Sequence, residues 1–337
     1  MDGPLWIDHH RPTVSAFPQA ELRNYLGRVS EGPINLILHG PPGSGKTAAV
    51  HALADQLHDD PENDLMTINV ADFFGMTKSE IADDPRFRGF IDSKRRRGSK
   101  AAMINHILTE MASYPPISGS FKTILLDNAE AMREDFQQAL RRIMERHYEA
   151  TQFVFTTRRV SALLPPIQSR CALVPVRAPT QAETVTVLEG IVEAEGVEYD
   201  QEGLEYVAGY ADGNLRRAIL AAQTTAQEEG AITMDAAYEV LDEVGYAQQF
   251  AAMLKQAEAG EFSDARSMLN DFLIDEGYGG EELLEAIVAV ARTRYDPDRA
   301  ANITAIAGEI EFDMTQGAND RVHLAHFLSQ LATVPTD

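Results

Sequence analysis

Gly40-Pro41-Pro42-Gly43-Ser44-Gly45-Lys46-Thr47 is the stretch that decides the fold of this 337-residue chain. It fits the pattern G-x-x-x-x-G-K-[ST], in which glycines let the backbone wrap phosphate oxygens and the following helix adds aligned N–H donors. The apolar run 34–39 comes before it and is typical of a buried strand, and residues 46–57 follow with helical spacing. This strand–loop–helix context favours a nucleotide site over an ordinary glycine-rich turn.

The loop and one distant carboxylate predict the cofactors. We expect Lys46 to reach the β- and γ-phosphates and the hydroxyl of Thr47 to bind Mg²⁺. Mg²⁺ also needs a carboxylate at the end of a neighbouring strand, and Asp127 closes the apolar run 123–127. ATP and Mg²⁺ are therefore the expected cofactors. The remaining nucleotide-binding positions of the loop are Gly40, Pro41, Pro42, Gly43, Ser44 and Gly45.

Hydrophobic periodicity divides the chain into an α/β part and a helical part. Strands are predicted at 34–39, 65–70, 123–127, 152–156 and 172–176, and their alternation with helical stretches implies a parallel sheet covered on both faces. After Pro179 the strand signals stop. Helices are predicted at 180–195, 201–210, 215–228 and 233–243, and then at 247–258, 262–275, 279–294, 299–312 and 318–332. We expect an α/β domain at 1–177, a small helical domain at 178–243 and a helical C-terminal domain at 244–337.

Composition excludes several classes of protein. The single cysteine, Cys171, rules out an intramolecular disulfide framework and a cysteine-based zinc site. No apolar run reaches the roughly 20 residues of a membrane-spanning helix, and the start of the chain lacks the features of a secretory signal. We therefore predict a soluble, cytoplasmic protein with no membrane partner.

The formal charge of −23 is distributed unevenly. Residues 1–180 hold 21 acidic and 21 basic side chains, whereas residues 181–337 hold 31 acidic and 8 basic ones. A neutral half beside an acidic half leaves room for a basic face that binds nucleic acid. Only six residues are lysine, and this acidic, lysine-poor composition suits either a salt-adapted host or ordinary acidic solubility.

The most basic stretch is 78–100, with eight basic residues against four acidic ones. It is either a contact for DNA or a protein partner, or a solvated loop whose charges offset the acidic half. The basic residues are Lys78, Arg86, Arg88, Lys94, Arg95, Arg96, Arg97 and Lys100.

The histidines show no metal-binding spacing. His9 and His10 are adjacent, and His51 and His58 are seven positions apart, but no H-E-x-x-H pattern occurs. Core or surface roles are the prediction for all four.

Five further stretches give the chain a family resemblance. They are W-I-D-H-H-R-P at 6–12, Q-Q-A-L-R-R-I-M-E at 137–145, P-I-Q-S-R-C at 166–171, G-N-L-R-R-A-I at 213–219 and G-A-N-D-R at 317–321. In this order they resemble the AAA+ ATPases, and specifically the archaeal-type small subunits of the replication factor C clamp loader. The resemblance covers nearly the whole chain. It implies an AAA+ P-loop core with a helical lid and an all-α collar.

The resemblance also implies a function and site residues. Such subunits form a pentameric, ATP-driven machine that opens a sliding clamp and places it on primed DNA. The implied partners are the large and small clamp-loader subunits, the sliding clamp and primer–template DNA. Carried over by position, Arg170 would be an arginine finger for the neighbouring subunit, Arg216 would contact ATP in its own subunit, and Arg11 and Pro12 would lie near the adenine.

Two positions depart from the family pattern. The usual D-E-A-D reads Asp127-Asn128-Ala129-Glu130, so Asn128 stands where a carboxylate should polarise the attacking water. An amide cannot accept that proton, and Glu130 is not expected to replace it. Arg158 occupies the place of the first sensor, usually Asn. With Lys46, Asn128 and Arg170 as the catalytic positions, we expect tight ATP binding and poor hydrolysis.

Two rival interpretations stay open at this stage. The first is a non-hydrolysing scaffold subunit that uses ATP only to assemble. The second is another AAA+ ATPase of DNA metabolism, which would predict a winged-helix domain, with strands, near the C-terminus.

Overall fold

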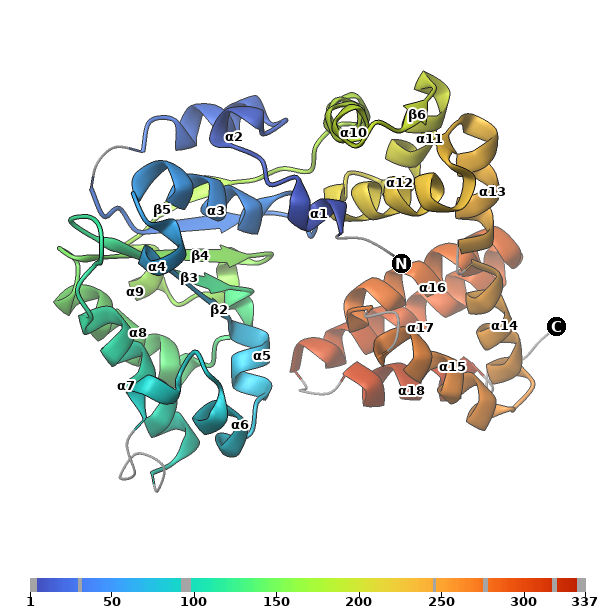
Figure 1. The fold of residues 1–337 in the computed structure, drawn as a ribbon. Coiled ribbons are helices and arrows are strands. Elements are labelled where there is room, and N and C mark those ends of the chain that lie inside the picture. The colour runs from blue at the N-terminus through green and yellow to red at the C-terminus, as the bar shows by residue number, and fades with distance from the viewer. Residues whose placement is uncertain are drawn as a thin grey trace. The chain divides into compact units, whose positions relative to one another are not determined.

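The chain is described here from a computed structural model that covers residues 5–29, 32–91, 98–244, 247–274, 278–316 and 320–331. It forms two compact units, residues 1–240 and residues 241–337 (Figure 1). The first unit contains the nucleotide loop and is described first.

A five-stranded parallel sheet forms the centre of the first unit. The strands are β1 (Leu36–His39), β2 (Leu65–Asn69), β3 (Lys122–Asp127), β4 (Thr151–Thr157) and β5 (Ala172–Pro175), in the order β2-β3-β4-β1-β5. All five predicted strands are present, with β1 beginning two residues later than expected. Asn35 lies just before β1, and its side-chain oxygen accepts a hydrogen bond from the Phe153 N–H at 2.8 Å.

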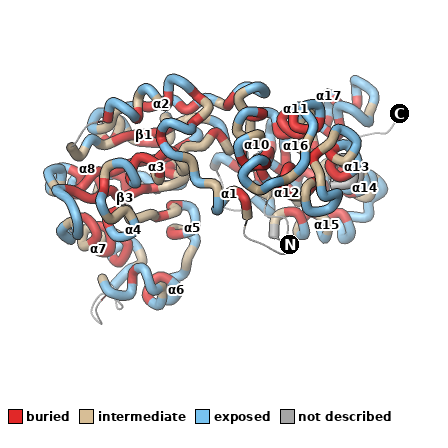
Figure 2. The backbone as a smooth tube through the Cα atoms, turned by 45° about the horizontal axis from the view of Figure 1, so that its top comes forward, coloured by how far each residue is buried: buried red, intermediate tan, exposed pale blue. Residues whose placement is uncertain are grey.

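Helices cover both faces of the sheet, as a parallel sheet requires. Leu36 and Leu38 face α2 (Ala20–Leu26) and α3 (Lys46–Leu57), while Ile37 faces the opposite core. That second core includes α7 (Lys100–Ser113) and α8 (Glu134–Arg146), which Figure 1 shows on the other side of the sheet. Figure 2 shows burial running along β1, β3 and α3. Shorter helices complete this part: α1 (Trp6–His9), α4 (Pro61–Asp64), α5 (Val70–Gly75), α6 (Lys78–Asp83) and α9 (Pro165–Gln168).

Four helices follow the sheet, close to their predicted bounds. They are α10 (Gln181–Glu195), α11 (Gln201–Ala211), α12 (Leu215–Glu229) and α13 (Met234–Val244). The expectation of no strand after Pro179 is wrong in one detail, because β6 (Glu198–Tyr199) and β7 (Ala231–Ile232) pair in parallel. Two-residue strands are too short to show any periodicity, and each begins within two residues of the glycine that caps the preceding helix, Gly196 or Gly230.

The second unit is helical throughout the residues that the structure describes. Its helices are α14 (Ala247–Glu258), α15 (Phe262–Ile274), α16 (Gly280–Arg294), α17 (Pro297–Gln316) and α18 (Asp320–Leu331), which share one apolar core. An ion pair is buried beside this core: Arg299 Nη2 lies 2.6 Å from Glu258 Oε1. Residues 317–319 of the G-A-N-D-R stretch lie outside the described residues.

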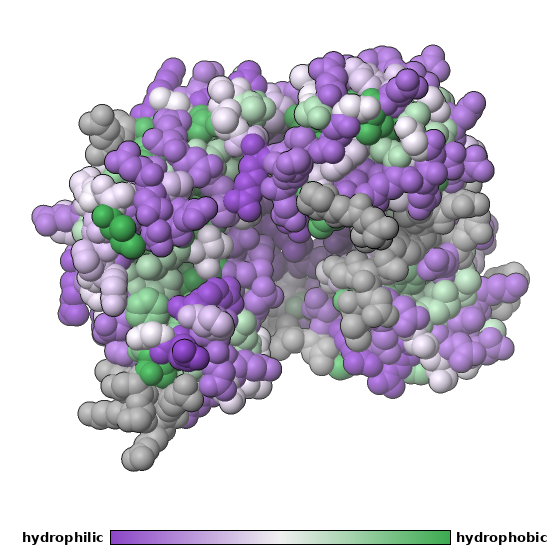
Figure 3. Space-filling view, viewed as in Figure 1, coloured by the Kyte–Doolittle hydropathy of each residue, from purple (hydrophilic) through white to green (hydrophobic). Residues whose placement is uncertain are grey.

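The surface is mostly hydrophilic on the face shown in Figure 3, where hydrophobic residues form only small patches. Among the described residues, no helix combines the length and the apolar composition needed to cross a bilayer.

Candidate nucleotide-binding site

The loop 40–45 leaves β1 and enters α3 through backbone conformations that need glycine. Gly43 has φ 67° and Gly45 has φ 94°, both in the left-handed region that side chains disfavour. The neighbours are equally restrictive, because a Cβ on Gly43 would lie 1.8 Å from Asn214 Oδ1. The glycine spacing therefore produces a loop whose amides lie at the start of α3, as phosphate binding requires.

Lys46 folds back over this loop. Its Nζ donates to the carbonyl oxygens of Gly40 at 2.9 Å and Pro41 at 2.6 Å. Burial lowers the pKa of Lys46 to about 8; Glu130 and Asp127 act against this shift, and Arg158 adds to it. A partly desolvated ammonium group held at the loop is the arrangement expected of a phosphate ligand.

Asp127 and Thr47 meet as the sequence predicts. Thr47 Oγ1 donates to Asp127 Oδ1 at 2.9 Å, and Thr156 Oγ1 donates to the same oxygen. The hydroxyl and the carboxylate are hard oxygen ligands from two different elements, the start of α3 and the end of β3. They fit a Mg²⁺ ion coordinated by one hydroxyl, one carboxylate and phosphate oxygens.

Asn128 lies at the edge of this group in a left-handed conformation, with φ 55°. Its backbone N–H donates to Thr156 Oγ1 at 3.2 Å. This bend places an amide side chain directly after the Asp127 carboxylate, where the family pattern has an acid.

Glu130 lies near the loop, but its carboxylate is engaged by Arg158. Glu130 Oε2 accepts the Arg158 backbone N–H at 3.3 Å, and Glu130 Oε1 lies 3.6 Å from Arg158 Nε. Arg158 follows β4, the neighbour of β1 in the sheet. The first carboxylate after Asn128 in the chain is thus paired with Arg158, the residue at the position of the first sensor.

The lid helices contact the loop directly. The Leu215 N–H donates to the Gly43 carbonyl oxygen at 3.0 Å, and Asn214 Oδ1 caps α12 by accepting the Arg217 N–H at 3.1 Å. Arg216 is the next residue of α12 and is exposed. The chain therefore places Arg216 one residue from a direct bond to the phosphate loop.

The N-terminal segment also reaches the site. Arg11 is close enough to His51 on α3 to help lower the pKa of that imidazole, although burial is the larger cause. Pro12 follows as a half-buried residue. Gln19 is almost fully buried, and its Nε2 donates to the carbonyl oxygens of Ser44 at 2.9 Å and Arg177 at 3.0 Å.

Arg170 is the one predicted site residue that lies elsewhere. It directly precedes Cys171 and β5, at the amino end of the parallel strands, whereas the loop follows the carboxyl end of β1. Four residues of strand span about 13 Å. The guanidinium is paired with Glu145 on α8, and its Nη1 donates to the Pro166 carbonyl oxygen at 2.7 Å. Arg170 therefore points away from its own phosphate loop.

The basic stretch 78–100 is only partly described. Lys78 begins α6, the Arg86 Nη2 lies 2.7 Å from Asp84 Oδ2, and Lys100 Nζ donates to the Phe74 carbonyl oxygen at 2.5 Å. Lys94, Arg95, Arg96 and Arg97 lie outside the described residues.

Sequence reasoning missed three residues that shape the site: Gln19, Thr156 and Asn214. Gln19 and Thr156 are polar residues whose partners are far away in the chain, so no local spacing marks them. The clearest available signal was Asn214, an N-cap residue directly before the helix predicted at 215–228.

Comparison with known families agrees with this arrangement. Residues 36–175 match the profile described as "ATPase family associated with various cellular activities (AAA)". Residues 186–227 match "RCF1/5-like, AAA+ ATPase lid domain", and residues 247–330 match "Replication factor C C-terminal domain".

Similar proteins extend the likeness over the whole chain. The "Replication factor C small subunit" of Staphylothermus marinus is 32% identical over 335 residues, which cover 97% of this chain and 94% of the relative. The protein of the same name from Archaeoglobus fulgidus is 30% identical, with 98% of both chains covered. Among solved structures, a point mutant of RuvB from Thermotoga maritima has a TM-score of 0.52 at 17% identity, covering 79% of this chain and 88% of that one. This last likeness concerns the fold alone.

Proposed function

The chain belongs to the replication factor C small-subunit family, and we propose that it acts as an ATP-binding subunit of a clamp loader in DNA replication. In this role it binds ATP–Mg²⁺ and assembles with large and small clamp-loader subunits. The complex places a sliding clamp on primer–template DNA. The observation that carries the proposal is the arrangement at one glycine loop: Lys46 bonds to the loop, Thr47 directly after it bonds to Asp127, and the lid is bonded to the loop at Gly43.

The proposed nucleotide site uses residues from three parts of the first unit. The loop 40–45 holds phosphates through its amides, Lys46 pairs with the terminal phosphates, and Thr47 with Asp127 holds Mg²⁺. The metal ion would neutralise charge on the phosphate oxygens. Arg216 reports bound nucleotide from the lid, and Arg11 with Pro12 lies beside the base.

We propose that this subunit hydrolyses ATP poorly. Asn128 can position a water molecule but cannot take its proton, and the nearby carboxylate of Glu130 is already paired with Arg158. Arg170, at the other end of the sheet, serves the site of a neighbouring subunit. Because each site then needs an arginine from a neighbouring subunit, hydrolysis depends on assembly of the complex.

The test replaces Asn128 by Glu in the assembled complex and measures DNA-stimulated ATP turnover. General-base catalysis contributes about 10²-fold or more, so the altered site should add a clear increment of turnover. The matched control carries both Asn128→Glu and Lys46→Ala, and the increment should vanish there because this site no longer binds ATP. Unchanged turnover on Asn128→Glu would contradict the proposed role of Asn128.

Two neighbouring hypotheses predict different outcomes. A pure scaffold subunit would show no turnover at its site even with Asn128→Glu, while ATP binding would still promote assembly. Another AAA+ ATPase of DNA metabolism would not co-purify with the clamp-loader subunits of its host, and mass measurement of the complex decides this. The part of residues 247–331 that the structure describes forms helices α14–α18 and no strand. A winged-helix domain would contain strands, so this favours the clamp loader.

The finer organisation is also part of this proposal. We divide the chain into a nucleotide-binding domain at 1–177, a lid at 178–243 and an oligomerisation collar at 244–337. The stretch 78–100 contacts DNA or a partner subunit, and the protein acts in the cytoplasm. The acidic, lysine-poor composition suits a salt-adapted host as well as ordinary solubility.

A further inference from the structure

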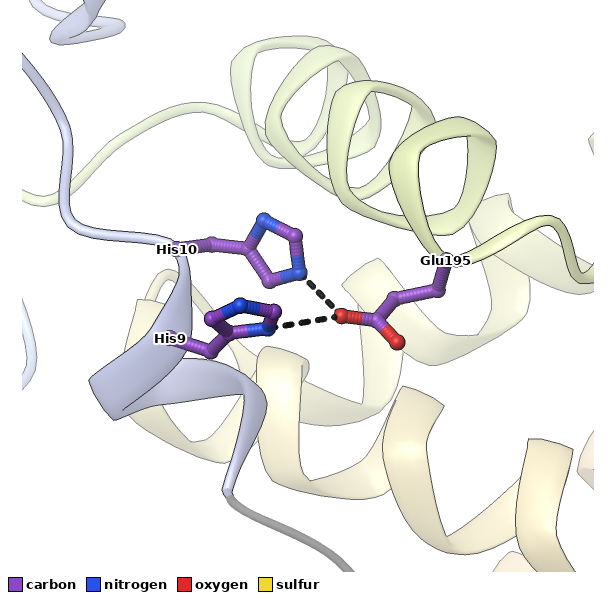
Figure 4. A group of neighbouring side chains, drawn as sticks. All are labelled: His9, His10 and Glu195. Carbon is purple, nitrogen blue, oxygen red and sulfur yellow. Dashed lines mark hydrogen bonds and ion pairs between the residues drawn. The ribbon is translucent and has the colours of Figure 1, made fainter.

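Two histidines and a glutamate converge between the N-terminal segment and the lid. His9 ends α1, His10 follows it, and Glu195 is the last residue of α10. Figure 4 shows both imidazole rings directed at the same carboxylate oxygen. His9 Nδ1 lies 3.3 Å from Glu195 Oε1, and His10 Nε2 pairs with that atom as well. One ligand atom from each residue lies within 4.8 Å of the other two.

We propose that His9, His10 and Glu195 form a binding site for a divalent transition-metal ion such as Zn²⁺. Two imidazole nitrogens and one carboxylate oxygen are a ligand set that Zn²⁺ accepts, with metal–ligand distances of about 2.0–2.2 Å. Ligands of a tetrahedral ion then lie about 3.4 Å apart. The His9–Glu195 separation is already close to this value, and an ion would replace the proton that joins His10 to Glu195.

The ligands are held by elements that are themselves fixed. Trp6 at the start of α1 is buried, and its backbone N–H donates to Gln223 Oε1 on α12 at 2.9 Å. Glu195 is followed by Gly196, whose φ of 69° ends α10. Neither anchor involves the three ligands, so the cluster does not have to fold around an ion. Such preorganisation favours binding because little ordering remains to be done.

Exposure leaves one side of the cluster open. His9 is 63% exposed, while His10 is 20% and Glu195 25% exposed. Three protein ligands with solvent access leave a fourth position for water or for an external ligand. The ion would tie the segment directly before Arg11 and Pro12 to helix α10 of the lid.

The sequence could not indicate this site. Glu195 is 185 positions from His10, and adjacent histidines match no metal-binding pattern. The site uses neither the nucleotide loop nor the Mg²⁺ ligands, so its test is independent of the proposed function.

Titration of the nucleotide-free, tag-free full chain with Zn²⁺ tests the site, with Co²⁺ absorption to report the ligand geometry. We expect one ion per chain. Glu195→Gln and His10→Gln should each weaken binding by more than about tenfold, since even changes outside the ligand set cost that much. Thermal unfolding without metal checks that each variant is folded, and Zn²⁺ should raise the melting temperature of the parent chain by more than that of either ligand variant.

His106 provides the matched control. Its Nδ1 lies 3.7 Å from Glu110 Oε1 on the same helix, which gives a His–Glu pair with no third ligand among the residues that the structure describes. His106→Gln should leave Zn²⁺ binding unchanged. Absence of binding by the parent chain, or equal binding by all the folded variants, would overturn the proposal.

Discussion

The guanidinium of Arg170 is paired with the carboxylate of Glu145, so α8 holds this arginine at the amino end of the sheet. The pair joins two of the stretches that give the family resemblance, residues 137–145 and 166–171. Because the phosphate loop lies at the opposite end of β1, Arg170 lies away from the nucleotide loop of its own chain, as the proposed role at a neighbouring site requires.

Replacing Arg170 by Ala should separate binding from assembly-dependent turnover. Nucleotide affinity of the isolated chain should stay unchanged, whereas hydrolysis at the neighbouring site should fall about 10³-fold or more. Fluorescent-nucleotide binding and turnover of the complex measure the two effects. Glu145→Gln is the milder partner variant, since it keeps Arg170 but loosens its position. Equal loss of affinity in the isolated chain would contradict a role in trans.

The affinity for ATP should fall as the pH rises above about 8. Burial lowers the pKa of Lys46 from its ordinary value of 10.5 to about 8 in the nucleotide-free chain, so the ammonium group loses its proton around pH 8. A bound triphosphate favours the charged form, and binding above pH 8 therefore takes up a proton. The dissociation constant should rise by up to about tenfold per pH unit.

Lys46→Arg is the matched control for this pH effect. Its guanidinium stays charged over the whole range, so the affinity of the variant should be lower but independent of pH. A parallel pH dependence in both proteins would assign the titration to another group.

Gly43→Ala should disrupt the phosphate loop for two separable reasons. The left-handed backbone costs an alanine about 1–2 kcal/mol, and the new Cβ would collide with Asn214 Oδ1. We expect nucleotide affinity to fall by about tenfold or more from strain alone. Asn214→Gly removes the collision at little cost to the helix cap. The variant with both Gly43→Ala and Asn214→Gly should bind nucleotide better than the summed losses of the two single variants predict. Additive losses would mean that the collision with Asn214 is relieved by another movement.

The buried pair Arg299–Glu258 should dominate the stability of the second unit. Arg299 Nε also approaches Glu258 Oε1 at 3.1 Å, and Tyr295 Oη donates to Glu258 Oε2 at 2.9 Å. Arg299→Met leaves a partly buried carboxylate without its cation, which costs at most about 3–5 kcal/mol, the range for fully buried pairs. Thermal unfolding of the full chain measures this loss. Adding Glu258→Gln should restore part of the lost stability, because it removes the unpaired charge. If the second substitution destabilises the chain further, the charge of Glu258 is not the cause of the loss.

Much of the fold was predictable because its signals are local. The run 123–127 is apolar and ends in a polar residue, so β3 and the position of Asp127 follow from periodicity. The helix at 46–57 begins and ends as predicted, since the glycine before Lys46 marks its start. In contrast, β6 and β7 are two-residue strands that depend on tertiary pairing and leave no pattern in the chain.

The site was less predictable than the fold for a related reason. Thr47 and Asp127 are found by motif and strand position. The roles of Gln19 and of the Glu130–Arg158 pair depend on contacts between distant elements, which a single sequence does not reveal.

The bond between the Leu215 N–H and the Gly43 carbonyl oxygen is made by main chain alone. Point substitutions at Leu215 other than proline can therefore alter packing without removing this bond, whereas a single-residue insertion or deletion in the turn before α12 would misalign it. The bond between loop and lid therefore tolerates a change of side chain at these positions. It does not tolerate a change in the number of residues before α12.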